Sequence, residues 1–237
     1  EAANKDDVHV RAFRRQSFRG ATLASILDTV PGSIRMFTTA DIAAAVLAYL
    51  IGSLSFAVIV SRALGLPDPH SYGSGNPGAT NVLRSGSKKA ALLTLVGDTL
   101  KGVLAVLLAK AFAAHFGITV NGIALVAVTV FLGHLFPLFF GFKGGKGVAT
   151  AAGVLWALDW RVGLGLTAIW ALVFAVTRVS SLSALIGSAA APVLGYVFFG
   201  NGAVFYATLV MAALLFWRHK ENIRRLASGE EAAFKKR

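Results

Sequence analysis

The chain has 237 residues, of which 56% are hydrophobic and 14% charged, and its mean hydropathy is +0.68. This composition leaves too little polar surface for a water-soluble globule, so it predicts an all-α membrane protein. The absence of cysteine excludes disulfides, thiolate nucleophiles and thiolate metal sites. The five histidines show no metal-ligand spacing. We therefore expect no metal cluster with protein ligands. We also expect no cofactor and no nucleic-acid partner.

Residues 1–35 form a basic segment without an apolar core of the length that a signal peptide needs. Its cations are Lys5, Arg11, Arg14, Arg15, Arg19 and Arg35. Met36 directly precedes the first apolar run, so we interpret residues 1–35 as an extension and expect the natural protein to begin at Met36. Amphipathic binding to a membrane surface is the alternative for this segment.

Seven apolar runs follow, and a bilayer crossing needs about 20 such residues. They cover residues 40–63, 90–113, 120–140, 148–158, 161–178, 182–199 and 202–217. The run 148–158 is short for a span and also fits a re-entrant or tilted piece. The predicted fold is a polytopic protein with seven transmembrane helices and glycine-rich cytoplasmic loops. Residues 36–226 form the membrane domain, and 227–237 form a polar basic tail.

The distribution of Lys and Arg predicts the orientation, because positive charge near span ends stays in the cytoplasm. The connections after spans one, three, five and seven, with the C-terminal tail, hold 14 of these cations. The opposite connections hold only Lys110 and Arg161. The glycine-rich loops and the C-terminus are therefore predicted to face the cytoplasm.

Several polar and small residues lie inside the apolar runs. Asp98 and Lys101 are three residues apart, which lets them pair on one helix face, with a structural role favoured over a proton relay. His134 fits a core histidine bonded to a carbonyl, although direct chemistry stays open. Arg62, Arg178 and Arg218 fit topology signals at span ends. Small residues favour close helix packing, and this is the interpretation for Gly97, Gly102, Gly153, Gly163, Gly165 and Gly187.

Three connections on the predicted cytoplasmic side fit an anion site. The first is SYGSGNPGATNVLRSGSKK, residues 71–89, whose glycines let backbone amides approach a ligand and whose Arg84 suits a phosphate. The second, FKGGKGVAT, has Lys143 and Lys146 around two glycines and opens a helix at Gly147. It is not a nucleotide P-loop, because Phe140 replaces the first glycine of that motif.

The third connection is FWRHKENIRRLASG, residues 216–229, where His219 and Asn222 are spaced to share a helix face. If the three segments converge, they form one site for a doubly anionic or multiply phosphorylated ligand. A carrier or channel for phosphorylated anions fits this composition too, but a carrier needs polar groups near the middle of the bilayer. A lipid-binding scaffold would leave the glycine-rich loops without a purpose.

Four stretches resemble the signatures of the bacterial integral-membrane glycerol-3-phosphate acyltransferase that uses acyl-phosphate as donor. They are SGNPGATNVLR (74–84), GHLFPLFFGFKGGKGVAT (133–150), SSL (180–182) and RHKENIRRL (218–226). The resemblance implies a seven-helix protein of the bacterial inner membrane with a cytoplasmic C-terminus. It also implies transfer of an acyl group to the sn-1 hydroxyl of glycerol-3-phosphate. The products are lysophosphatidic acid and inorganic phosphate, in the first step of phospholipid synthesis.

The resemblance also implies roles for individual residues. Those expected to bind glycerol-3-phosphate and orient its hydroxyl are Ser74, Arg84, Lys146, His219 and Asn222. Those expected to hold the phosphate of the acyl donor are Gly75, Asn76, Thr80, Asn81, Lys143, Gly144, Gly145, Gly147, Ser180 and Ser181. No acyl-enzyme is expected, which ranks a covalent Ser74 low. His219 can act as general base, but the donor phosphate is the favoured proton acceptor.

Overall fold

The computed structural model describes residues 37–234, and every regular element in that part of the chain is helical. The predicted all-α class is therefore confirmed for these residues. The helices are α3 (Thr39–Gly52), α4 (Phe56–Ala63), α5 (Ala79–Leu83), α6 (Lys88–Phe116), α7 (Val120–Leu135), η1 (Leu138–Phe140), α8 (Val148–Leu158), α9 (Trp160–Thr177), α10 (Ser180–Phe199), α11 (Ala203–Arg218) and α12 (Lys220–Ala227). The predicted extension, residues 1–35, lies outside the described residues.

Five helical stretches among the described residues are long and apolar enough to cross a membrane. They are Thr39–Ala63, Lys88–Phe116, Val120–Phe140, Trp160–Thr177 and Ser180–Phe199, and Val148–Leu158 and Ala203–Arg218 are shorter apolar helices. Large apolar side chains on their outer faces are exposed, including Leu172 at 68% and Val176 at 77%. An apolar surface of this kind suits contact with lipid.

The first apolar run is not one continuous helix. It breaks between Gly52 and Phe56, which separates α3 from α4. Ser53 and Lys101 satisfy the carbonyls at the break: the Ser53 hydroxyl donates to the Tyr49 carbonyl (2.8 Å), and the Lys101 ammonium donates to the Leu54 carbonyl (2.8 Å). A buried cation from α6 therefore replaces the missing helical hydrogen bond.

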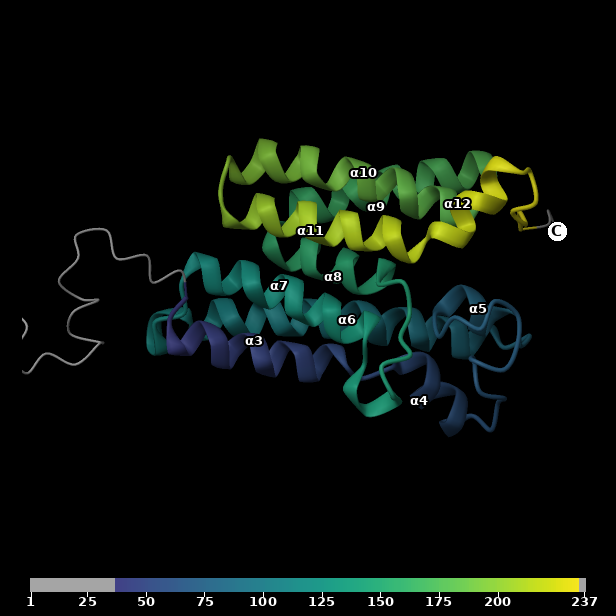
Figure 1. The fold of residues 1–237 in the computed structure, drawn as a ribbon, viewed down its shortest axis with the longest axis horizontal. Helices are drawn as coiled ribbons and strands as arrows, with labels where there is room; N and C mark the ends of the chain where they lie inside the picture. Colours follow the sequence, from purple (N-terminus) through teal and green to yellow (C-terminus); the bar gives the residue numbers. More distant parts are fainter. Residues whose placement is uncertain (1–36, 235–237) are drawn as a thin grey trace, which may run out of the picture. The chain divides into compact units, whose positions relative to one another are not determined.

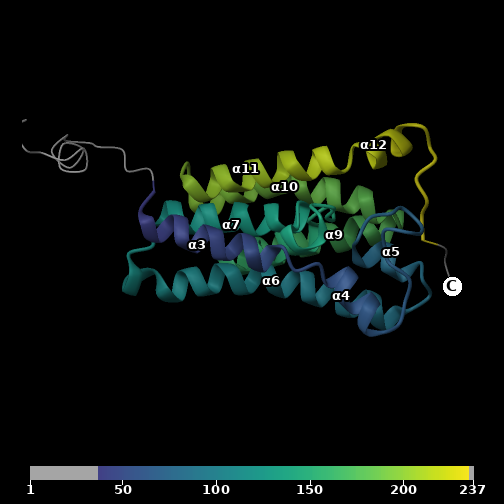
Figure 2. The same cartoon turned by 60° about the horizontal axis from the view of Figure 1, so that its bottom comes forward.

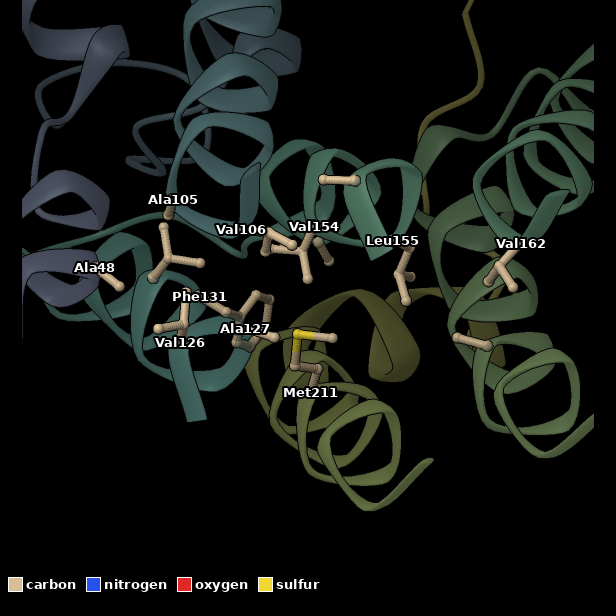
Figure 3. Close-up of a cluster of buried hydrophobic side chains, with 14 of the residues drawn as sticks. Ala48, Ala105, Val106, Val126, Ala127, Phe131, Val154, Leu155, Val162 and Met211 are labelled. Carbon is tan, nitrogen blue, oxygen red and sulfur yellow. The ribbon is translucent and has the colours of Figure 1, made fainter. Parts of the chain in front are cut away.

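Alanine and valine make up most of the core, which lets the helix backbones approach closely. Figure 3 shows Val106, Phe131, Val154 and Met211 meeting at the centre of this cluster, each from a different helix. A Cβ atom on Gly153 would lie 2.0 Å from the Thr99 carbonyl oxygen, so α6 and α8 pack at a distance that only glycine allows.

The prediction that glycine allows close helix packing is confirmed at most of the six positions. Added Cβ atoms at Gly97, Gly102, Gly153 and Gly163 would collide with neighbours, and at Gly165 the neighbour lies 3.3 Å away. It is wrong for Gly187, where a Cβ atom would meet nothing within 4 Å. The space beside Gly187 belongs to the cavity described below.

The polar segments gather at one end of the helical bundle. Figures 1 and 2 show α5 and α12 at this end, while α3 begins at the opposite end. The chain after α12 turns back along the same end, in yellow in Figure 2. The three connections predicted to form an anion site therefore belong to elements that the fold can bring together.

Candidate active site

A cavity of about 530 Å³ lies among these elements. Its polar lining includes Ser74, Asn76, Thr80, Asn81, Arg84, Lys146, Ser180, Ser181, His219, Asn222, Arg225 and Glu231. Its apolar lining includes Leu155, Trp156, Leu166, Trp170, Met211 and Leu215, which come from α8, α9 and α11. The cavity therefore offers cations and neutral donors together with an apolar wall between helices.

All five residues predicted to be catalytic line this one cavity: Ser74, Arg84, Lys146, His219 and Asn222. Six residues of the predicted substrate-binding set also line it: Asn76, Thr80, Asn81, Gly147, Ser180 and Ser181. Its lining does not include Gly75, Lys143, Gly144 and Gly145. The structure thus brings together residues of the three sequence segments. Parts of both glycine-rich loops lie outside the cavity lining.

Asn81 organises the first glycine-rich loop from inside. Its side-chain NH₂ donates to the carbonyls of Pro69 (2.8 Å) and Tyr72 (3.1 Å), and its side-chain oxygen accepts the Ser74 backbone N–H (2.9 Å). Asn81 is 2% exposed, and a buried amide with these partners has little capacity left for a ligand. Its contacts fix the backbone of Ser74 at the cavity wall.

The second glycine-rich loop packs tightly against α7. A Cβ atom on Gly144 would lie 2.1 Å from the His134 carbonyl oxygen, and one on Gly145 would lie 2.3 Å from the His134 ring. The Gly145 N–H donates to the His134 carbonyl (3.2 Å). These two glycines are therefore required for close packing of the loop against α7.

Arg218 holds the same loop from the other side. Its guanidinium donates to the carbonyls of Gly144 (2.7 Å) and Gly145 (3.1 Å). The interpretation of Arg218 as a topology signal alone is therefore incomplete. Its planar fork of donors reaches both carbonyls at once, which fixes the loop that carries Lys146.

The Lys146 ammonium contacts the third segment, residues 216–229. It donates to the side-chain oxygen of Asn222 in α12. Burial and the nearby Arg225 guanidinium lower the pKa of Lys146 to about 8, although Glu231 acts in the opposite direction. The cavity therefore holds a lysine whose charge an incoming anion would stabilise.

His219 sits at the junction of α11 and α12 and is 3% exposed. Its ring Nδ1 lies 2.8 Å from the Leu215 carbonyl oxygen, which can only accept, so Nδ1 carries the proton. Burial lowers the pKa of His219 to about 4, and the Lys146 charge adds to this effect. The ring is therefore neutral at pH 7, and its Nε2 is a hydrogen-bond acceptor.

Asp98, Lys101, His134 and Thr150 form a buried polar cluster between α6, α7 and α8. The predicted pair is confirmed, since the Lys101 ammonium lies 2.8 Å from the Asp98 carboxylate. The carbonyl partner expected for His134 is wrong: its ring Nδ1 lies 3.1 Å from the Thr150 hydroxyl and 3.5 Å from Asp98. This cluster supports the His134 ring against which the second loop packs.

Glu231 is a residue at the cavity that sequence reasoning missed. Its carboxylate accepts hydrogen bonds from Ser181 (2.6 Å), Asn222 (2.5 Å) and Arg225 (2.6 Å). Burial opposes its charge, but these three donors outweigh burial and lower the pKa of Glu231. It lies in a stretch of tail without a motif, so no local signal identifies it.

Comparisons with known proteins show the family of this chain. The profile of the glycerol-3-phosphate acyltransferase family matches residues 42–229. The chain is 58% identical over 188 residues to the glycerol-3-phosphate acyltransferase of Cupriavidus metallidurans, covering 79% of this chain and 93% of that protein. It is 57% identical over 188 residues to the enzyme of the same name from Paraburkholderia phymatum, covering 79% and 90%.

Two solved structures share the fold. They are crystal structures of PlsY (YgiH), an integral membrane glycerol 3-phosphate acyltransferase, in a glycerol 3-phosphate form and a lysophosphatidic acid form. Each is 37% identical to this chain, with TM-scores of 0.76 and 0.75, and covers 82% of it. The matches cover 96% and 95% of the PlsY chains. The chain is thus an integral membrane protein that belongs to the glycerol-3-phosphate acyltransferase family.

Proposed function

We propose that this protein transfers a fatty acyl group from acyl-phosphate to the sn-1 hydroxyl of glycerol-3-phosphate. One observation carries the proposal: Ser74, Arg84, Lys146, His219 and Asn222, from three distant segments, line a single cavity that also has an apolar wall. Family membership favours an enzyme over the carrier that composition alone allows. The products would be lysophosphatidic acid and inorganic phosphate.

The cations of the cavity suit a reaction between two phosphorylated substrates. Two phosphates repel each other, and Arg84 and Lys146 would offset this repulsion while they hold glycerol-3-phosphate. The amino end of α8, with Gly147, Val148 and Ala149 at the cavity, adds backbone N–H groups that favour an anion. Thr80, Ser180 and Ser181 would hold the phosphate of the donor.

The chemistry of an acyl-phosphate needs no covalent enzyme intermediate. The sn-1 oxygen attacks the acyl carbon, and the resulting oxyanion is stabilised by donors and cations of the cavity. The bond between the acyl carbon and the phosphate oxygen then breaks, and phosphate leaves with the proton of the hydroxyl. The chain has no cysteine to form a thioester. Holding both substrates in reactive geometry is then the main task of the protein.

His219 would position the acceptor hydroxyl and leave proton transfer to the donor phosphate. A base with a pKa of about 4 is poorly matched to proton abstraction at pH 7. Its neutral Nε2 can still accept a hydrogen bond from the hydroxyl and so direct the oxygen lone pair. Asn81 acts indirectly in this proposal, because its hydrogen bonds hold the Ser74 backbone in place.

We further propose that the protein crosses the bacterial inner membrane seven times, with the cavity and the C-terminus in the cytoplasm. The short apolar helices α8 and α11 would join the five longer stretches as spans. The connections of the cytoplasmic side carry 14 Lys and Arg, against two opposite. The acyl chain would lie along the apolar wall, where its methylenes avoid water.

The experiment supplies purified protein with acyl-phosphate and glycerol-3-phosphate, without acyl-CoA or acyl carrier protein, and measures phosphate release. We expect release by the wild type and a loss of about 10²-fold or more in Arg84→Ala and Lys146→Ala. Lys220→Ala is the matched control, because Lys220 is exposed and is not part of the cavity lining. An inactive wild type, or active Arg84→Ala and Lys146→Ala variants, would contradict the proposal.

A further inference from the structure

The chain after α12 forms a short strap, residues 229–234, and Glu231, Ala232 and Phe234 of this strap line the cavity. It turns at Gly229, whose φ is +74°, and the N–H groups of Glu230 (2.8 Å) and Glu231 (3.1 Å) both donate to the Arg225 carbonyl. At its far end the Phe234 N–H donates to the Arg178 carbonyl (2.9 Å). The family profile ends at residue 229, so residues 230–234 of the strap lie beyond the matched region.

The Phe234 ring gives the strap its second anchor. It meets Phe174 edge to face, with ring centroids 5.6 Å apart. Phe234 and Arg84 line the cavity and also a second cavity of about 460 Å³, which Leu83, Gly86 and Lys88 complete. The strap therefore lies between the candidate active site and a neighbouring hollow that carries cations.

Glu231 of the strap holds its carboxylate where a substrate phosphate is expected. The described lining includes two carboxylates, and one of them, Asp98, already pairs with Lys101. The other, Glu231, is 11% exposed at its side chain and accepts hydrogen bonds from Ser181, Asn222 and Arg225. Two of these donors, Ser181 and Asn222, are the groups to which the proposed function assigns substrate binding.

A phosphate and this carboxylate cannot share these donors. Ser181 has one O–H to donate, and it is directed at Glu231. Two anions held at the same site would also repel each other strongly in a partly buried environment. Besides the three side-chain hydrogen bonds of Glu231, whose donors a phosphate would take over, the strap has four backbone hydrogen bonds and one ring pair. Only one of these backbone bonds, from the Phe234 N–H to the Arg178 carbonyl, ties the strap to another helix, so few contacts oppose its displacement.

We propose that the strap is an internal competitor of the substrates: the Glu231 carboxylate occupies the phosphate position in the empty enzyme, and an incoming phosphate displaces it. This inference rests on the proposed function, because that function assigns Ser181 to the phosphate of the donor, and Asn222 belongs to the set expected to bind glycerol-3-phosphate. Displacement of the strap frees both donors and removes Phe234 from between the two cavities. While the strap occupies the site, the substrate cannot bind. The apparent affinity for the substrate is therefore reduced in proportion to the fraction of molecules whose site is blocked.

The test compares Glu231→Gln with Glu230→Gln in the full-length protein. Glutamine keeps the shape of residue 231 but removes its charge, and Glu230 is an exposed neighbour that is not part of the cavity lining. We expect Glu231→Gln to lower KM by at least about fivefold for the substrate whose phosphate displaces the strap, with kcat retained. Glu230→Gln should match the wild type.

Separate measurements identify the phosphate concerned. KM for glycerol-3-phosphate at saturating donor reports the acceptor phosphate, and KM for acyl-phosphate at saturating acceptor reports the donor phosphate. A fall in either KM supports the inference. Unchanged KM values, or a raised KM, would overturn it, and a raised KM would make Glu231 a positioning residue. A wild type without acyltransferase activity would instead contradict the proposed function.

A spin label supplies a test that leaves Glu231 in place. The chain has no cysteine, so Ala233→Cys carries a single nitroxide on the exposed part of the strap. Saturating glycerol-3-phosphate or inorganic phosphate should narrow the spectrum, because release of the strap increases the motion of the label. A spectrum that stays unchanged while equilibrium dialysis shows bound ligand would overturn the inference.

Discussion

Lys146 and Asn222 lie 76 positions apart in the chain, yet the Lys146 ammonium donates a hydrogen bond to the Asn222 side-chain oxygen. This bond joins the loop before α8 to α12, two of the three segments that make up the candidate site. The same Asn222 donates through its NH₂ to Glu231. Asn222 therefore connects Lys146 with Glu231, the strap residue whose carboxylate lines the cavity.

The pKa of Lys146, about 8, predicts a loss of activity at alkaline pH. A lysine is charged below its pKa, so its contact with a phosphate is present at pH 7 and is lost as pH rises through about 8. We expect kcat/KM for glycerol-3-phosphate, which reports the free enzyme, to fall above about pH 8. The residual activity of Lys146→Arg should lack this fall. A flat wild-type profile from pH 7 to 9.5 would contradict the assignment.

The neutral ring of His219 predicts how kcat/KM depends on pH on the acidic side. With a pKa of about 4, His219 is unprotonated throughout the range from pH 5.5 to 8, so it should contribute no acidic limb there. His219→Ala should lower kcat/KM by about 10²-fold, because an acceptor that positions the hydroxyl is lost. His219→Gln, which keeps an acceptor, should retain more activity. An acidic limb with a midpoint between pH 6 and 7 that disappears in His219→Gln would make His219 the base.

Arg218 should act on substrate binding through the loop that it holds. Arg218→Lys keeps the charge but cannot donate to the carbonyls of Gly144 and Gly145 in the same forked geometry. We expect KM for glycerol-3-phosphate to rise about tenfold as Lys146 loses its fixed position. Lys220→Arg, a change of the same kind at an exposed neighbour, should leave KM unaltered. Equal KM values in both variants would remove this role from Arg218.

The open space beside Gly187 predicts control over the length of the acyl chain. A Cβ atom there meets nothing within 4 Å, and Gly187 lines the cavity. Gly187→Leu should fill this space, so turnover of long acyl-phosphates should fall relative to short ones. Val193→Leu, on the exposed face of the same helix, is the control. An unchanged ratio of long to short substrates in Gly187→Leu would place the acyl chain elsewhere.

Two glycine-to-alanine substitutions should differ in sign for thermal stability. Gly153→Ala forces a Cβ atom to within 2.0 Å of the Thr99 carbonyl oxygen, so we expect a loss of about 1–3 kcal/mol. Gly187→Ala meets no neighbour and gains helix propensity, which should stabilise by up to about 1 kcal/mol. Thermal unfolding in detergent compares the two directly. A lower midpoint for Gly187→Ala than for Gly153→Ala would contradict the packing described for α6 and α8.

Helix positions were largely predictable, because hydropathy alone sets the length of an apolar run. The predicted span 148–158 coincides with α8, and the runs 161–178 and 182–199 correspond to α9 and α10. The break between α3 and α4 was not predictable from the local run. It depends on Lys101, which lies 47 positions from the Leu54 carbonyl that it binds.

Site residues that lie in a recognisable sequence motif were predictable. Residues whose role depends on tertiary packing were less predictable. Ser74, Arg84 and Asn222 lie in recognisable stretches, and all three line the cavity. Gly144 and Gly145 were expected at the ligand, but the close approach that they permit is to His134. Glu231 carries no pattern, since only the turn at Gly229 brings its carboxylate to Ser181 and Asn222.

The most direct test of the central claim is whether phosphate release requires both substrates. Direct transfer in one cavity predicts that purified protein mixed rapidly with acyl-phosphate alone releases no burst of phosphate. Adding glycerol-3-phosphate should then release phosphate and lysophosphatidic acid in equal amounts. A burst stoichiometric with enzyme in the absence of glycerol-3-phosphate, together with a labelled acyl group on the protein, would contradict the account.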